Sequence, residues 1–320
     1  MSSEATAVVD TTAIPVVDFD GFTGGDPSRR AATVAALRAA LESYGFLYLR
    51  NHGIPATVLE AVFAQSRAFF ALPQEAKEAV KPQEGGNTLG YGGLGSQALD
   101  EDKPADMKET YQSGPEPGVY RRNVWPEGLP GFRDTAMAFH RAATAACDQL
   151  MAAIAVSLGL PEAYFEPFYD RRDSTVRLLH YPPLRGTPAP GQIRAGAHTD
   201  YGGINLLFQD DEGGLEIQTA DGAWVPAPAV PGTAVVNTGD LIERWTNGQF
   251  RSSPHRVVNP VGPAAARDRY SMVLFDIPNR DALVTCLEPC QSAEWPPKFP
   301  PTTVGEHLRA RVLASQRHLY

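Results

Sequence analysis

The hydrophobic positions of the chain follow helical spacing in its first half and form short extended runs in its second half. In the first half, apolar residues recur three or four positions apart, as they do on one face of a helix. Start signals and this spacing predict helices that begin at Asp26-Pro27, Ile54-Pro55 and Pro73, and a long helix over residues 131–158. Apolar runs at 14–19 and 46–49 predict strands. We therefore expect a mainly helical N-terminal part over residues 14–170, preceded by a loose polar tail at 1–12.

From residue 174 onward the pattern changes to short β segments every ~8–12 residues, separated by Gly, Pro and Asp turns. These segments lie near 175–181, 193–200, 204–208, 215–218, 223–227, 233–238, 252–259 and 269–277. Such regular spacing is typical of a β-sandwich or barrel, so we expect a β core over residues 174–280. Thr303 and Glu306 form a capping box that predicts a closing helix over residues 303–316. The prediction is one domain of mixed α+β class spanning residues 1–320.

The glycine-rich stretch at residues 85–96 contains a formal GxGxxG sequence from Gly90 to Gly95. No predicted strand precedes it and no amphipathic helix follows it, so we exclude a dinucleotide site there. We predict a mobile loop, which could border an active site.

Composition and charge narrow the class of protein. The chain has 320 residues and a net charge of −9, which argues against general affinity for nucleic acid or an anionic membrane. It shows neither a secretory h-region nor a segment apolar enough to span a bilayer. Its three cysteines are too few and too unevenly placed for a disulfide framework or a cysteine zinc site. We expect a reduced cytoplasmic protein of enzyme size, and the oligomeric state stays open.

The candidate chemistry begins at His198 and Asp200, which are two residues apart at the end of a predicted β segment. Side chains at i and i+2 of a strand lie on the same face, so the imidazole and the carboxylate point together. They could supply two ligands of a facial iron triad, which consists of two His and one carboxylate. A His-x-Asp pair by itself is a weak signal, because most such residues are ordinary polar groups. His255, on a later β segment, is the candidate third ligand.

The arrangement of the last two β segments predicts what lies beside His255. If segments 252–259 and 269–277 form a hairpin centred on Gly262, position 255 lies opposite position 269. Arg269 and Ser271 would then share one face close to the metal.

A buried arginine needs an anion, and its planar fork binds a carboxylate through two hydrogen bonds. Tyr181, at the end of segment 175–181, could add a third donor to Arg269 and Ser271. A metal triad next to a carboxylate socket indicates a metal-chelating co-substrate with a distal carboxylate, and 2-oxoglutarate fits that description.

These residues carry a family resemblance that covers nearly the whole chain. The chain resembles the isopenicillin N synthase-like group of Fe(II)/2-oxoglutarate oxygenases. The matching motifs are Ile14-Pro15-Val16-Val17-Asp18, Tyr44-Gly45-Phe46, Asn51-His52-Gly53-Ile54, Phe69-Phe70-Ala71-Leu72-Pro73, Tyr181-Pro182-Pro183, His198-Thr199-Asp200, Asn237-Thr238-Gly239-Asp240, Ser253-Pro254-His255-Arg256-Val257 and Arg269-x-Ser271. The chain departs from many plant members at Leu179, where they carry an Asn that helps to orient the keto acid.

The resemblance implies a double-stranded β-helix, or jelly-roll, core flanked by helices. It implies Fe(II) on His198, Asp200 and His255. It implies 2-oxoglutarate on Arg269, Ser271 and Tyr181. The implied activity is that of a 2-oxoglutarate-dependent non-haem iron dioxygenase. With O2, such an enzyme converts 2-oxoglutarate to succinate and CO2 and attacks a C–H bond of its substrate.

We expect the substrate to be a small organic metabolite, in keeping with a role in secondary metabolism. Hydroxylation is the commonest outcome in the family, and desaturation or cyclisation uses the same residues. Tyr201 and Arg177 are the candidate substrate residues. Arg177 shares the inward face of its segment with Tyr181 if alternation holds, so it could contact the substrate or the keto acid; a surface ion pair is an equal alternative.

Two other functions stay open at this point. The first is an oxidase of the same fold that uses O2 without 2-oxoglutarate, and formation of succinate separates it from an oxygenase. The second is a non-catalytic metal- or ligand-binding relative, against which the intact triad argues. The sequence does not identify the substrate.

Overall fold

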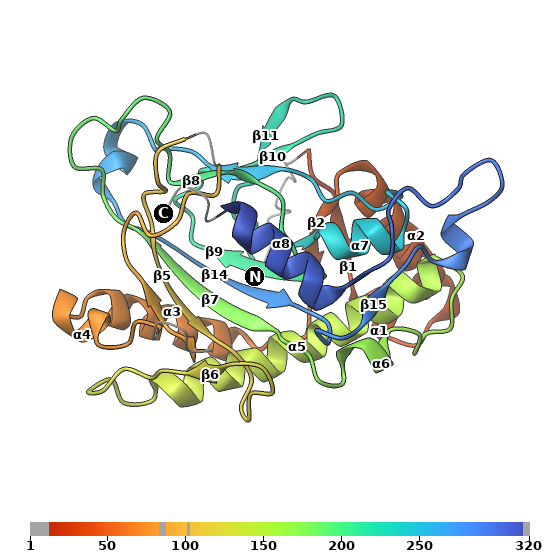
Figure 1. Ribbon diagram of the computed structural model, residues 1–320, viewed down its shortest axis with the longest axis horizontal. Coiled ribbons are helices and arrows are strands. Elements are labelled where there is room, and N and C mark those ends of the chain that lie inside the picture. The colour runs from red at the N-terminus through yellow and green to blue at the C-terminus, as the bar shows by residue number, and fades with distance from the viewer. Residues whose placement is uncertain (1–12, 83–87, 101–102, 316–320) are drawn as a thin grey trace, which may run out of the picture.

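The computed structural model describes residues 13–82, 88–100 and 103–315, so the predicted tail at 1–12 lies outside the described residues. Two β-sheets form the centre of the molecule, and helices cover one side of the larger sheet (Figure 1). The larger sheet has the strand order β1-β2-β12-β9-β14-β7-β5-β4, and the smaller one the order β11-β10-β13-β8. Apart from the parallel pair of β1 and β2, the strands in both sheets pair antiparallel.

The strands of the larger sheet are β1 (Val16–Asp18), β2 (Phe46–Arg50), β4 (Tyr91–Gly92), β5 (Glu109–Ser113), β7 (Thr175–Tyr181), β9 (Ile204–Gln209), β12 (Thr233–Thr238) and β14 (Arg269–Asp276). Those of the smaller sheet are β8 (Ala195–His198), β10 (Leu215–Gln218), β11 (Trp224–Pro226) and β13 (His255–Val257). Two small sheets pair β3 (Thr88–Leu89) with β6 (Arg122–Asn123) and β15 (Leu283–Val284) with β16 (Thr302–Thr303). Each of the eight segments predicted between residues 175 and 277 matches one of the strands β7 to β14, with β9 extending one residue beyond its predicted segment. The expected jelly-roll core flanked by helices is confirmed.

The helices are α1 (Asp20–Thr23), α2 (Pro27–Ser43), α3 (Ala56–Phe70), α4 (Gln74–Glu78), α5 (Phe132–Ser157), α6 (Glu166–Tyr169), α7 (Asp240–Trp245) and α8 (Val304–Ser315), with 3-10 turns at Gly262–Ala266 and Glu288–Cys290. The predicted capping box is present: the Thr303 amide donates to the Glu306 carboxylate at 3.0 Å, and the Glu306 amide donates to Thr303 Oγ1 at 3.2 Å. Within the described residues, none of the helices combines the length and the apolar character that crossing a membrane requires.

The larger sheet has two different faces, because side chains alternate along each strand. One face packs against α3 and α5 in a large hydrophobic cluster that includes Leu178, Leu206 and Leu274. The opposite face meets the smaller sheet in a second cluster, to which Leu179 and Val235 belong. The interior between the two sheets therefore receives the alternate residues of β7, β9, β12 and β14.

The predicted hairpin centred on Gly262 is wrong. Strand β13 pairs with β10 and β8 in the smaller sheet, whereas β14 pairs with β7 and β9 in the larger one. His255 lies opposite His198, and Arg269 lies opposite Tyr181. The connection between the two strands therefore crosses from one sheet to the other.

The N-terminal part contributes more β structure than the hydrophobic pattern suggested. Strand β5 pairs with β7 inside the larger sheet, and β4 pairs with β5. The prediction of a loop over residues 85–96 is therefore wrong at Thr88–Leu89, which form β3, and at Tyr91–Gly92; residues 83–87 lie outside the described residues. Close packing requires glycine at position 90, because a Cβ there would lie 2.0 Å from the Val80 carbonyl oxygen.

Candidate active site

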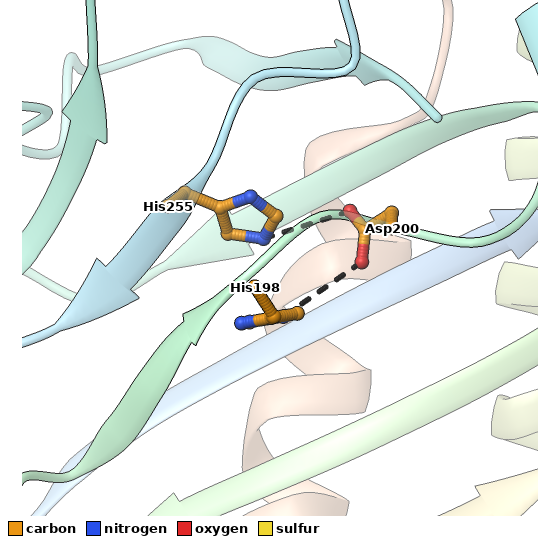
Figure 2. A group of neighbouring side chains, drawn as sticks. All are labelled: His198, Asp200 and His255. Carbon is orange, nitrogen blue, oxygen red and sulfur yellow. Dashed lines mark ion pairs between the residues drawn. The ribbon is translucent and has the colours of Figure 1, made fainter. Parts of the chain in front are cut away.

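His198, Asp200 and His255 converge at one end of the smaller sheet. His198 ends β8, and His255, its partner in the sheet register, begins β13. The Asp200 carboxylate reaches both imidazoles: Oδ1 lies 3.9 Å from His198 Nε2, and Oδ2 lies 3.6 Å from His255 Nε2. Figure 2 shows the three side chains directed toward a common point. One ligand atom from each residue lies within 4.8 Å of the other two, which fits a single metal ion.

Two buried amides hold the Asp200 carboxylate from the interior of the larger sheet. Asn205 Nδ2, from β9, donates to Asp200 Oδ2 at 2.8 Å, and Asn237 Nδ2, from β12, donates to the same oxygen at 2.7 Å. Both hydrogen bonds come from amide N–H groups and satisfy a buried acceptor. They also fix its orientation, as outer-shell groups do at metal sites.

The backbone around Asp200 is fixed by the Asn237-Thr238-Gly239-Asp240 motif. The Asp240 amide donates to the Asp200 carbonyl at 2.8 Å, and the Gly239 amide donates to the Gly203 carbonyl at 2.7 Å. A Cβ at Gly239 would lie 2.5 Å from the Gly202 carbonyl oxygen, so only glycine permits this close approach. The motif thus positions the carboxylate through both its side chain and its backbone.

His198 is held through the ring nitrogen that faces away from Asp200. Its Nδ1 is 2.8 Å from the carbonyl oxygen of Gly196, which makes Nδ1 the protonated nitrogen and leaves Nε2 free to bind a metal. The Gly196 amide donates in turn to Asp106, which forms a buried ion pair with Lys108. Burial lowers the pKa of His198 well below its ordinary value, and the nearby imidazole of His255 lowers it further. A neutral imidazole is the form that binds metal ions.

Arg269, Ser271 and Tyr181, the residues of the predicted carboxylate socket, lie together on the inward faces of β14 and β7. Arg269 is 1% exposed, and its donors reach the Gly213 carbonyl, the Gln209 side chain and Ser271 Oγ. Its guanidinium lies 4.7 Å from the centroid of the Tyr181 ring, and burial raises the pKa of Tyr181. In the described part of the chain, Arg269 forms no ion pair with a carboxylate. A buried cation without an anion fits the carboxylate of a keto acid.

A cavity of about 670 Å³ opens beside the triad. His198 and Asp200 line it together with Arg177 and Tyr201, the two predicted substrate residues. The hypothesis of a surface ion pair for Arg177 is therefore wrong: the side chain faces the cavity, and its NH2 group donates to Gln112 at 3.1 Å. Helix α8 forms part of the wall through residues that include Leu308 and Val312.

Some residues that support the site were not predicted from the sequence. Asn205 and Gln209 lie on the inward face of β9, alternating with Leu206 and Phe208 on the helix-packed face. The sequence signal that could have identified them is the occurrence of polar residues at alternate positions of an otherwise apolar strand. The ring nitrogens of His180 lie 2.7 Å from Glu109 and 2.7 Å from Asp268, away from the cavity.

Comparison with known proteins agrees with this geometry. Residues 14–128 match the model of the N-terminal domain of non-haem dioxygenases in morphine synthesis, and residues 172–278 match that of the 2OG-Fe(II) oxygenase superfamily. The chain is 37% identical to the proline hydroxylase buaE of Petromyces alliaceus, over 93% of this chain and 98% of the relative. The chain belongs to the 2OG-Fe(II) oxygenase superfamily: it is a 2-oxoglutarate-dependent non-haem iron dioxygenase.

Solved structures extend the comparison to the bound co-substrate. A full-length Neurospora crassa protein, solved in complex with alpha-KG (2-oxoglutarate), is 36% identical and superposes with a TM-score of 0.87, covering 96% of this chain and 97% of that one. The complex of the same protein with alpha-KG and thymine is 35% identical in the alignment, with a TM-score of 0.87 over 96% and 98% of the two chains. Fe(II) and 2-oxoglutarate are the cofactor and co-substrate of this family. This result favours an oxygenase over the O2-only oxidase and the non-catalytic relative.

Proposed function

We propose that the chain oxidises a C–H bond of a small organic metabolite, with hydroxylation as the principal outcome. The observation that carries this proposal is that the His198, Asp200 and His255 cluster opens into a cavity large enough for such a molecule. The relatives named for proline hydroxylation and for a thymine complex support a small-molecule substrate. The cytoplasmic location expected from the sequence stays a prediction.

His198, Asp200 and His255 would hold the Fe(II) ion in this account. When bound together, iron, 2-oxoglutarate and O2 supply the oxidative chemistry, in which RH, 2-oxoglutarate and O2 give ROH, succinate and CO2. The protein orients the substrate and limits the access of water. The two amides on Asp200 and the Gly196 carbonyl beside His198 keep the ligand set in place without iron, which lowers the cost of ordering it.

Arg269, Ser271 and Tyr181 would bind the distal carboxylate of 2-oxoglutarate. Their place on β14 and β7 puts this socket in the interior between the two sheets, on the same inward face of β7 as Arg177. Arg177 and Tyr201 face the cavity and would contact the substrate.

Formation of succinate tests this proposal. The purified protein should convert 2-oxoglutarate to succinate only when Fe(II) and O2 are both present, at a slow basal rate without substrate. His198→Ala should abolish this conversion because one of three metal ligands is lost. Normal succinate formation by H198A would contradict the role of His198.

A further inference from the structure

Arg177 differs from Arg121 and Arg280, which also line the cavity, because no carboxylate of the described residues forms an ion pair with it. Arg121 and Arg280 share Asp173, at 3.0 and 2.8 Å. Among the described residues, Arg177 has a neutral partner instead, the Gln112 side-chain oxygen at 3.1 Å. Its Nε is buried and has no hydrogen-bond partner. An arginine side chain stays charged in a protein, so this corner of the cavity carries an uncompensated positive charge.

The position of the guanidinium is fixed from one side. It lies over the Phe275 ring, 4.8 Å from the ring centroid, and both residues line the cavity. Stacking on an aromatic face orients the planar fork and leaves its edge available. The side chain is held before any ligand arrives, as expected of a recognition residue.

The negative charge of Asp200 does not satisfy Arg177. Burial lowers the pKa of Arg177, and the charge of Asp200 is the strongest effect that opposes this. Asp200, however, is committed to Asn205 and Asn237 and would be a ligand of the iron. An anion entering the cavity beside the triad would therefore be stabilised.

Part of the remaining cavity wall suits an apolar body, although Asp173, Asp281 and Glu306 also line the cavity. Leu99, Phe275 and Ile277 line it together with Leu308 and Val312 of α8. A molecule with one charged end and an apolar remainder matches this distribution of side chains.

Resting on the function proposed above, we propose that the primary substrate is a carboxylic acid whose carboxylate binds Arg177. The carboxylate would form hydrogen bonds to the guanidinium fork, and the apolar part of the substrate would lie against Phe275 and α8. This assignment makes Arg177 the residue that selects an acid over a neutral analogue. It is a site separate from Arg269, which lies on another strand.

The test uses matched acids and their neutral primary amides: phenylacetate and 3-phenylpropionate with the corresponding carboxamides. Each compound is added to the enzyme with Fe(II), O2 and saturating 2-oxoglutarate, and the stimulation of succinate formation above the basal rate is measured. At least one acid should give half-maximal stimulation at a concentration ~10- to 100-fold below that of its amide, the size expected of a charge-assisted fork. If no acid is preferred to its amide, the proposal is wrong.

Variants then assign the preference to Arg177. Arg177→Gln should remove the difference between acid and amide, and Arg177→Lys should restore part of it. Arg133→Gln, at an exposed arginine paired with Glu116, is the matched control. The affinity for 2-oxoglutarate, measured anaerobically without a probe, should change less than about 2-fold in Arg177→Gln, a shift too small for loss of a charge-assisted contact. A large loss of 2-oxoglutarate affinity in Arg177→Gln would show that Arg177 binds the keto acid instead. Failure of the wild type to bind 2-oxoglutarate would overturn the proposed function itself.

Discussion

At the scale of single residues, the site contains buried charged groups, such as Arg269 and Arg177, that form no ion pair with a carboxylate among the described residues. Arg269 donates to a backbone carbonyl, an amide and a hydroxyl, yet has no anion among the described residues. Burying a charged group in this way costs stability unless a ligand compensates. Such groups indicate function more strongly than the surrounding apolar core does.

Arg269 therefore gives a prediction about co-substrate binding. Arg269→Lys keeps a charge but loses the fork, so the KM for 2-oxoglutarate should rise by about 10- to 100-fold. Succinate formation at varied 2-oxoglutarate concentration measures this change. Arg267→Lys is the control, because Arg267 is 57% exposed and pairs with Glu212 at the surface. Equal KM values for R269K and the wild type would remove Arg269 from the socket.

At the scale of elements, strands with alternating or strongly apolar patterns could be predicted, and pairings between them could not. The limits of β7, β10 and β12 agree with the sequence pattern because Gly, Pro and Asp turns bound them. The hairpin between β13 and β14 was wrong because a local turn signal does not tell whether the next strand stays in the same sheet. Strand β5 escaped prediction because its sequence, Glu109–Ser113, is mostly polar and is buried through ion pairs and hydrogen bonds.

The site also contains some features that local sequence predicts and others that depend on how the strands pair. His198 and Asp200 could be predicted to point together from strand geometry alone. The role of Asn237 could not be deduced, although its motif was recognised, because it depends on β12 lying beside β9 in the larger sheet.

Helix α8 gives a prediction at the element scale. Arg311 pairs with Asp240 at 3.2 Å, donates to Thr199 Oγ1 at 3.0 Å and lies over the Tyr201 ring. These contacts attach α8 to the segment that carries His198 and Asp200. Arg311→Ala should therefore speed hydrogen exchange of the α8 amides, while β12 and α5 keep their protection.

A control variant makes this prediction specific. Leu313→Ala changes a side chain that is 59% exposed on the same helix, and should leave exchange unchanged. Unaltered exchange in R311A would show that the hydrophobic contacts of α8 suffice to hold it.

At the scale of the whole molecule, Asp276 links stability to pH. It is fully buried at the end of β14, where it accepts hydrogen bonds from Ser174 and Arg172. Burial raises the pKa of Asp276 from 3.8 to about 6. Because the folded pKa lies above the unfolded one, the stabilising effect of protonation is fully present below pH ~4 and is lost as the pH rises through about 6.

Asp276→Asn should remove this dependence. Between pH 4.5 and 7.5 the free energy of unfolding of the wild type should fall relative to D276N, by on the order of 1–3 kcal/mol for a shift of this size. Urea unfolding of both proteins at the two pH values measures the difference. A constant difference would mean that Asp276 has an ordinary pKa in the folded state.

The central claim is that the His198, Asp200 and His255 cluster holds Fe(II) beside a 2-oxoglutarate socket. An anaerobic titration of the apoprotein with Fe(II) and then 2-oxoglutarate, followed by visible absorption, tests it most directly. The account predicts a weak metal-to-ligand charge-transfer band that appears only when both are present and is absent in His198→Ala. Iron binding without the band would contradict the co-substrate site, and the absence of both would contradict the metal site itself.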